Sequence, residues 1–362
     1  MLRTFGFIAL ALLAACMQPV AEQPPGGGAS SGTSGVDAPA KIAATRSAPA
    51  VVFVVDGSGS MQDPAGQGQS QSKWQDLVGV LGGPASASGS VFQLQSALAL
   101  ASGEPARLGL VTFGGGASDS CAPGAVRVAP QANVADAIDD VLRTQSPQGG
   151  TPTAASLKVA GQALASAQAE GRAAFIILLT DGAPNCNAQW AGEPSACQDD
   201  QSGGCASTGC CYTGPSAESA CTPQGCLDRD ETVATVGSLF DSDIETFVVG
   251  FGAALGDEGS LSLQTLDAMA EAGGANALYR ASSPLELSTS LDGVRGELLQ
   301  RCRFALAAAA PSRFVSVVLQ SDTETRTVAA SHATLSADRQ RLSIDDPACA
   351  AVPGHAVSLT FE

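Results

Sequence analysis

The feature that most constrains the fold is a series of short, continuous apolar runs, rich in β-branched residues, that alternate with stretches of helical periodicity. Strands buried on both faces have such sequences, and they are typical of parallel sheets. We therefore predict an α/β fold, a doubly wound, mostly parallel sheet flanked by helices. The predicted strands cover residues 50–55, 108–113, 175–179, 244–251 and 277–280, with an extended piece at 125–129 that forms a hairpin with the second.

After residue 301 the pattern changes to short alternating or β-branched segments. Such segments predict a small β-rich module over residues 302–362. Residues 49–301 then form the α/β domain, and a Cys-rich insert covers residues 183–226. Residues 17–48 are rich in Pro, Gly, Ser and Ala, a composition that buries too little apolar surface to fold, so we expect a flexible linker there.

The first residues, 1–16, have the features of an export signal. Arg3 precedes an apolar run over residues 5–13 that is too short to span a membrane. The sequence LAAC ending at Cys16 resembles the bacterial lipobox, which implies a lipid on Cys16 and an anchor in the cell envelope. By the same resemblance Met17 favours the outer membrane, on its periplasmic or surface face. The alternative is an ordinary signal peptide in which Cys16 is incidental.

Eleven cysteines are present, and ten remain when the lipobox cysteine is set aside. An even number suits disulfides in an oxidising compartment. Seven lie in the insert, so one of them must pair outside it or stay free. Cys121 is the nearest candidate, with Cys186 as its favoured partner, and Cys302 would then pair with Cys349. A zinc site among the insert cysteines is the alternative, but their spacing is irregular and no histidine is near.

Five oxygen-bearing side chains are predicted to meet at one edge of the sheet. Asp56 and Asp181 each follow a buried strand, and ligands of open α/β sheets bind beyond the carboxyl ends of the strands. Ser58 and Ser60 follow Asp56 at alternate positions, and Thr151 lies in a third loop before a helix. Oxygen ligands with two carboxylates suit a hard divalent cation such as magnesium.

At these residues the chain resembles a known family. DGSGS at 56–60, Thr151 within GGTPT, and TDG at 180–182 look like the metal-ion-dependent adhesion site of von Willebrand factor type A domains, which have a Rossmann-like fold. The resemblance covers residues 49–300. It implies one Mg²⁺, or Ca²⁺ or Mn²⁺, contacted directly by the serines and, in some states, by the threonine, with the aspartates often acting through water. A glutamate or aspartate of a partner commonly completes the coordination.

The predicted function is divalent-cation-dependent binding of a protein or matrix ligand, an adhesion-type activity at the cell envelope. Two other functions stay open: an assembly scaffold in which the metal only stabilises the fold, and a metal-dependent hydrolase. We expect no enzyme, because the only histidines, His332 and His355, lie in the C-terminal module and leave Ser58 and Ser60 without a general base.

Charge and the insert refine this prediction. The net charge of -17 and the lack of a basic cluster exclude nucleic acid as a partner and limit membrane contact to the lipid anchor. The insert follows Asp181 directly, so it is expected to form a disulfide-stabilised wall of the binding surface, with Trp190 and Tyr212 as candidate contact residues. The alternative is a stapled surface loop with no role in contact.

Overall fold

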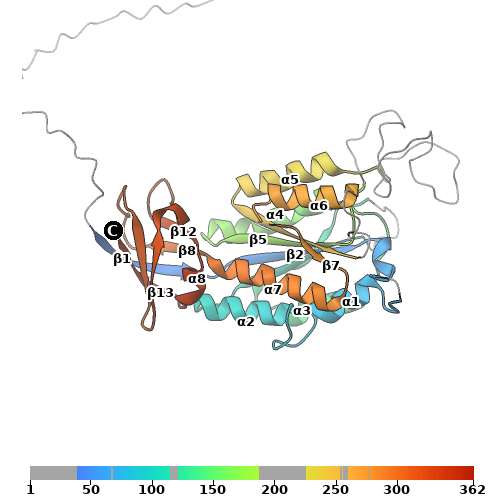
Figure 1. Cartoon of the computed structure of the whole chain (residues 1–362), viewed down its shortest axis with the longest axis horizontal. Coiled ribbons are helices and arrows are strands. Elements are labelled where there is room, and N and C mark those ends of the chain that lie inside the picture. Colours follow the sequence, from blue (N-terminus) through green and yellow to red (C-terminus); the bar gives the residue numbers. More distant parts are fainter. Residues whose placement is uncertain are drawn as a thin grey trace, which may run out of the picture. The chain divides into compact units, whose positions relative to one another are not determined.

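The computed structural model describes most of the chain from residue 39 onward (Figure 1). The predicted lipobox, the first part of the predicted linker, and most of the Cys-rich insert, including Trp190 and Tyr212, lie outside the described residues. Among the described helices, none has both the length and the hydropathy of a transmembrane span. The described residues are 39–66, 68–114, 121–186, 226–252, 255, 260–275 and 277–362.

Part of the described chain forms a six-stranded sheet in the order β4-β3-β2-β5-β6-β7. Neighbouring strands are parallel except for β4, which is antiparallel to β3. The predicted doubly wound, mostly parallel sheet with its hairpin is therefore confirmed. The strands are β2 (Ala50–Gly57), β3 (Arg107–Gly114), β4 (Ala125–Ala132), β5 (Ala174–Thr180), β6 (Ile244–Phe251) and β7 (Tyr279–Ala281).

Both faces of this sheet are covered by helices (Figure 1). In β2, Val51, Phe53 and Val55 pack with α1, α2, α3 and α7, whereas the alternate residues Val52 and Val54 pack with α4, α5 and α6. This two-sided burial explains why the strands are continuously apolar. The helices are α1 (Lys73–Leu81), α2 (Val91–Ser102), α3 (Ala135–Thr144), α4 (Thr153–Ala169), α5 (Arg229–Asp241), α6 (Leu261–Ala272) and α7 (Pro284–Gln300).

A second sheet has seven antiparallel strands in the order β10-β9-β13-β1-β8-β12-β11 within the described residues. It has its own apolar core, to which the short helix α8 (Ala348–Ala351) contributes. The predicted disulfide between Cys302 and Cys349 is present in this core. The strands are β1 (Ala40–Ser47), β8 (Arg301–Leu306), β9 (Ser316–Gln320), β10 (Thr325–Ala329), β11 (Ala333–Leu335), β12 (Arg341–Asp345) and β13 (Ala356–Phe361).

The position of β1 corrects the predicted domain boundaries. The composition predicts residues 40–47 to be part of the flexible linker, but they form a central strand of the second sheet, paired with β13 on one side and β8 on the other. The β module is therefore built from both sides of the α/β domain rather than from residues 302–362 alone. The physical reason is that Ile42 and Ala44 point into the module's core at alternate positions, a burial that only the partner strands provide.

The chain passes directly between the two sheets at both crossings. Ala48 and Pro49 are the only residues between β1 and β2, and β8 begins at the residue that follows α7. Arg46 strengthens this junction, because its buried guanidinium reaches carbonyl oxygens at the end of α2 and around α8. Arg301, at the second crossing, forms ion pairs with Glu245 on β6 and Glu297 on α7.

A buried carboxyl lies where the insert rejoins the α/β domain. Asp228, immediately before α5, is 4% exposed, and its Oδ1 atom has no hydrogen-bond partner among the described residues. Its backbone N–H donates to the carbonyl of Pro184 at 2.9 Å. Burial, with a smaller contribution from Glu231, raises the pKa of Asp228 to about 7.

This pKa predicts a pH-dependent stability. Because the folded-state pKa lies above the unfolded value of 3.8, the folded protein binds more protons between these two pH values. The free energy of unfolding should therefore fall as the pH rises from 4 to 7. Asp228→Asn should remove this loss and stabilise the protein by on the order of 2 kcal/mol at pH 8.

Urea unfolding of the wild type and of Asp228→Asn at pH 4.5 and pH 8 measures this effect. Asp230→Asn is the matched control, because Asp230 is exposed in the first turn of the same helix. We expect the control to follow the wild type at both pH values. Equal stability of Asp228→Asn and the wild type at pH 8 would contradict the prediction.

Candidate metal centre

Asp56 is held at the carboxyl end of β2, next to β5. Val55 pairs with Leu179 across these parallel strands, so Asp56 and Thr180 come next in register. The Thr180 hydroxyl donates to Asp56 Oδ2 at 2.6 Å, and the Ser58 backbone N–H donates to Asp56 Oδ1 at 2.8 Å. Asp56 is fully buried, so these two donors fix its carboxylate at the sheet edge.

The loop after Asp56 places two hydroxyls beside the second carboxylate. Ser58 Oγ and Ser60 Oγ lie 3.0 Å apart, and the Ser60 hydroxyl donates to Asp181 Oδ1 at 2.9 Å. The loop requires glycine at position 57, because a Cβ there would lie 2.8 Å from the backbone oxygen of Phe113. The structure thus brings Asp56, Ser58, Ser60 and Asp181 together, as the sequence predicts.

Thr151 belongs to a third loop that adjoins the other two. The Gly59 N–H donates to the carbonyl of Gly149 at 3.0 Å, which ties this loop to the serine loop. Asn185 ties it to the segment after β5, because its Oδ1 accepts from the Thr151 N–H at 2.6 Å and its own N–H donates to the Thr151 carbonyl at 3.2 Å. Thr151 itself is buried at 6% exposure.

Electrostatics at the site are dominated by two carboxylates and one ammonium. Burial, together with the charge of Asp181, raises the pKa of Asp56 to about 7. The Lys73 ammonium, at the start of α1, forms an ion pair with Asp181, with 2.6 Å between Nζ and Oδ2. The two carboxylates therefore have different environments: Asp56 is held by neutral donors, and Asp181 by a cation and a hydroxyl.

The donor set fits a hard divalent cation. The five side chains from three loops offer only carboxylate and hydroxyl oxygens, the ligands that Mg²⁺ and Ca²⁺ prefer. Asp56 and Asp181 would balance the charge of the ion, and Ser58, Ser60 and Thr151 would add neutral oxygens. A bound cation would supply a Lewis-acidic position at which an anionic oxygen of another molecule can bind.

Three residues at the site, Thr180, Asn185 and Lys73, are not predicted from the sequence. Thr180 directly precedes the predicted ligand Asp181, and Asn185 follows it four residues later, so their polar side chains near Asp181 are the signal that could have identified them. Lys73 gave no such indication, because a lysine in the first turn of a helix is usually a solvent-exposed residue. Its burial is decided by tertiary packing, since its side chain runs past Gly252 at the end of β6 to reach Asp181.

The predicted disulfide between Cys121 and Cys186 is present. It joins the segment before β4 to the segment that follows Asp181, so it fixes the start of the insert beside the metal-centre residues. Cys226, where the described chain resumes, is also disulfide-bonded. The remaining insert cysteines, whose pairing the sequence does not predict, lie outside the described residues.

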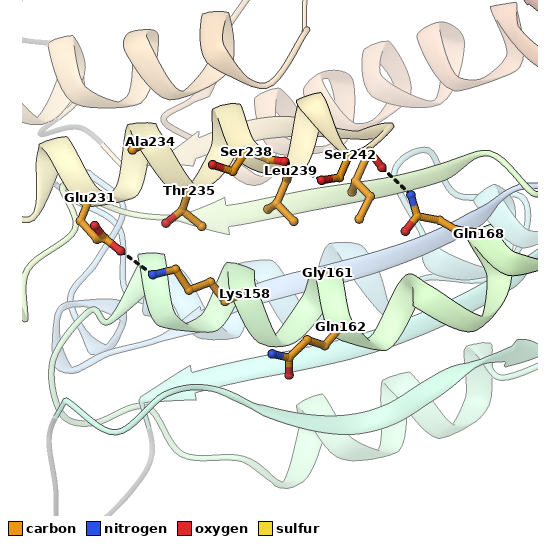
Figure 2. A pocket seen from close by; sticks show the side chains of 11 residues that line it. Lys158, Gly161, Gln162, Gln168, Glu231, Ala234, Thr235, Ser238, Leu239 and Ser242 are labelled. Carbon is orange, nitrogen blue, oxygen red and sulfur yellow. Dashed lines mark hydrogen bonds and ion pairs between the residues drawn. The ribbon is translucent and has the colours of Figure 1, made fainter. Parts of the chain in front are cut away.

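A groove between α4 and α5 lies apart from these residues (Figure 2). Its lining combines small residues such as Gly161 and Ser238 with longer side chains such as Leu239. An ion pair between Lys158 and Glu231 and a hydrogen bond from Gln168 to the Ser242 carbonyl cross it. None of the five predicted metal ligands lines this groove, so it is not part of the candidate site.

An open, mostly parallel α/β sheet with an oxygen-lined site at its carboxyl edge defines the class of this protein. Residues 51–183 match the family model of the von Willebrand factor type A domain. This chain therefore contains a domain of the von Willebrand factor type A family. No curated protein sequence matches the chain.

Several solved structures resemble the chain at low sequence identity. An aerotolerance-related membrane protein from Bacteroides fragilis is 15% identical over 68% of this chain and 97% of its own, with a TM-score of 0.40. The pilus adhesin SpaC from Lactobacillus rhamnosus GG is 16% identical over 90% of this chain and 41% of its own, with a TM-score of 0.44. The manganese-loaded TRAP protein of Plasmodium vivax is 12% identical over 80% of this chain and 97% of its own, with a TM-score of 0.40.

Proposed function

We propose that this protein is a divalent-cation-dependent binding module of the adhesion type. The observation that carries the proposal is the connected set of oxygens at the sheet edge, in which Ser58, Ser60 and Asp181 form a hydrogen-bonded chain beside the buried Asp56. One Mg²⁺, or Ca²⁺ or Mn²⁺, held there would bind a carboxylate of a protein or matrix ligand. The family match over residues 51–183 supports the same role.

We also propose that the protein acts at the cell envelope and is not an enzyme. A lipid on Cys16 would anchor the protein in the cell envelope, in the outer membrane, and the binding site would act on that surface. We propose no enzymatic activity, because the serines lack a histidine base: His332 and His355 are exposed residues of the β module. A screen for hydrolysis in the presence of magnesium or manganese that found turnover would contradict this part.

A second candidate function is an assembly scaffold that acts without the cation. The ion pair between Lys73 and Asp181 favours it, because the ammonium already balances one carboxylate. In that case partner binding would depend on the β module.

Retention of envelope proteins on the immobilised protein distinguishes the two functions. The cation-dependent module predicts that partners retained in magnesium are lost with EDTA and with Ser58→Ala, since this variant removes a metal-directed hydroxyl. Asp136→Ala, an exposed carboxylate on α3, is the matched control and should retain them. Retention that survives EDTA and Ser58→Ala would support the scaffold and contradict the proposed function.

A further inference from the structure

Lys73 is built into the metal centre rather than displayed on the surface. The residue is 8% exposed, although it lies in the first turn of α1. Its backbone N–H donates to the carbonyl of Asp63 at 2.8 Å, and Ser72 caps the helix start through the backbone N–H of Gln75. The side chain is confined as well, because a Cβ at Gly252 would lie 3.3 Å from Lys73 Cδ.

The two oxygens of Asp181 have separate partners. Oδ1 accepts from the Ser60 hydroxyl at 2.9 Å and so belongs to the hydroxyl chain of the metal centre. Oδ2 accepts from the Lys73 ammonium at 2.6 Å. The Asp181 side chain is only 2% exposed, so water screens this ion pair little. The ammonium therefore occupies the carboxylate oxygen that the hydroxyl chain leaves unused.

The ammonium of Lys73 makes the net charge of the metal centre less negative. When Asp56 and Asp181 are both ionised, as holding a cation requires, they contribute two negative charges, and Lys73 contributes one positive charge, so the three side chains sum to one negative charge. A divalent cation would change that sum to one positive charge. Without Lys73 the corresponding sums would be two negative charges before loading and zero after it.

We propose that Lys73 is a permanent counter-charge that stays on Asp181 when the cation binds. It weakens the attraction of the empty site for a free cation and leaves the loaded site with a net positive charge. The loaded site therefore selects an anionic ligand, such as a carboxylate, over a neutral one. This inference rests on the proposed cation-dependent function and names Lys73 as the residue that sets the charge of the loaded site.

The test compares Mn²⁺ binding by the wild type, Lys73→Gln and Lys41→Gln. Glutamine keeps a hydrogen-bond donor of similar reach but no charge. Lys41→Gln is the matched control, because Lys41 is exposed on β1 of the β module. By Coulomb attraction in a partly buried site we expect Lys73→Gln to bind Mn²⁺ about tenfold more tightly. We expect the control to match the wild type.

A second measurement addresses the anionic ligand. Acetate, added to the Mn²⁺-loaded proteins, would displace bound water and lower the water-proton relaxation enhancement of the ion. Lys73→Gln should need about tenfold more acetate than the wild type for the same effect. Circular dichroism in EDTA verifies that the variant is folded, and Lys73→Met, which fills the same space without a donor, replaces it if it is not.

Each outcome decides between the inference and the proposed function. Tighter Mn²⁺ binding and weaker acetate binding by the Lys73 variant support the inference. Equal Mn²⁺ affinity, or equal acetate affinity, in wild type and variant overturns the inference and leaves the proposed function standing. Mn²⁺ binding only in the variant means that the ammonium replaces the cation, which also overturns the inference. If neither the wild type nor the variant binds Mn²⁺, the proposed function itself is contradicted.

Discussion

Replacing Arg46 with methionine is expected to lower the free energy of unfolding by roughly 3 kcal/mol, because buried carbonyl groups lose their donor. The guanidinium donates to the carbonyls of Ala101, Cys349 and Val352, at 2.9, 2.7 and 3.3 Å. Ala101 is in the last turn of α2, Cys349 is the second residue of α8, and Val352 directly follows α8. Arg46 thus places a positive charge at the C-terminal end of α2, where the helix dipole is negative.

Burying the charged guanidinium of Arg46 is unfavourable, and its hydrogen bonds to carbonyl oxygens offset this loss of hydration. The residue is 4% exposed, and burial lowers the pKa of Arg46 to about 10, so the side chain is still charged at neutral pH. No carboxylate pairs with it among the described ion pairs, so carbonyl oxygens alone stabilise the charge. Methionine fills a similar volume but donates no hydrogen bond.

Urea denaturation of Arg46→Met measures this prediction, with Lys41→Met as the matched control on the same strand. Lys41 is exposed, and its loss should change stability by less than about 0.5 kcal/mol. If Arg46→Met were as stable as this control, the account of the junction between the two sheets would be wrong.

Removal of the disulfide between Cys302 and Cys349 is expected to cost still more. The bond links the second residue of β8 to α8 and has a sequence separation of 47 residues. In the chain-entropy model a loop of this length contributes roughly 4 kcal/mol by restricting the unfolded chain. Both cysteines are buried in the core of the β module, so truncation to alanine also removes packing contacts.

Equilibrium unfolding of the double variant Cys302→Ala, Cys349→Ala in urea, under non-reducing conditions, measures the loss. Cys302→Ala, Cys349→Val keeps more of the buried volume and separates the packing part from the loss of the cross-link. We expect both variants to be destabilised, the first by more. A loss below about 1 kcal/mol in both would show that the cross-link does not restrict the unfolded chain as the model assumes.

The α/β domain could be predicted in detail because its strands are buried on both faces. Runs such as Phe175–Leu179 indicate burial on both faces, and the runs over residues 50–55 and 175–179 are followed by polar residues that mark the sheet edge. The same reasoning located Asp56 and Asp181, since parallel strands bring their carboxyl ends together. Asp56 and Asp181 thus follow from the ends of buried strands, whereas Ser58, Ser60 and Thr151 follow from their positions in the adjoining loops and from the resemblance to the adhesion-site motif.

Strand β1 could not be predicted, because its sequence does not indicate burial. Its sequence, AKIAATRS, has one large apolar side chain, Ile42, and places Arg46 at a buried position. Whether such a segment is a strand depends on the partner strands β13 and β8, which come from the far end of the chain. Lys73 was missed for a related reason, because its burial depends on Gly252 and Asp181 rather than on its neighbours in sequence.

The central claim, a divalent cation held by Asp56, Ser58, Ser60, Thr151 and Asp181, is tested most directly by isothermal titration. Mn²⁺ and Mg²⁺ are titrated into the metal-free, folded wild type and into Asp56→Ala. We predict saturable one-to-one binding by the wild type that is weakened by at least about tenfold in Asp56→Ala, which loses a carboxylate ligand. Equal binding by both proteins, or no binding by the wild type, would contradict the claim.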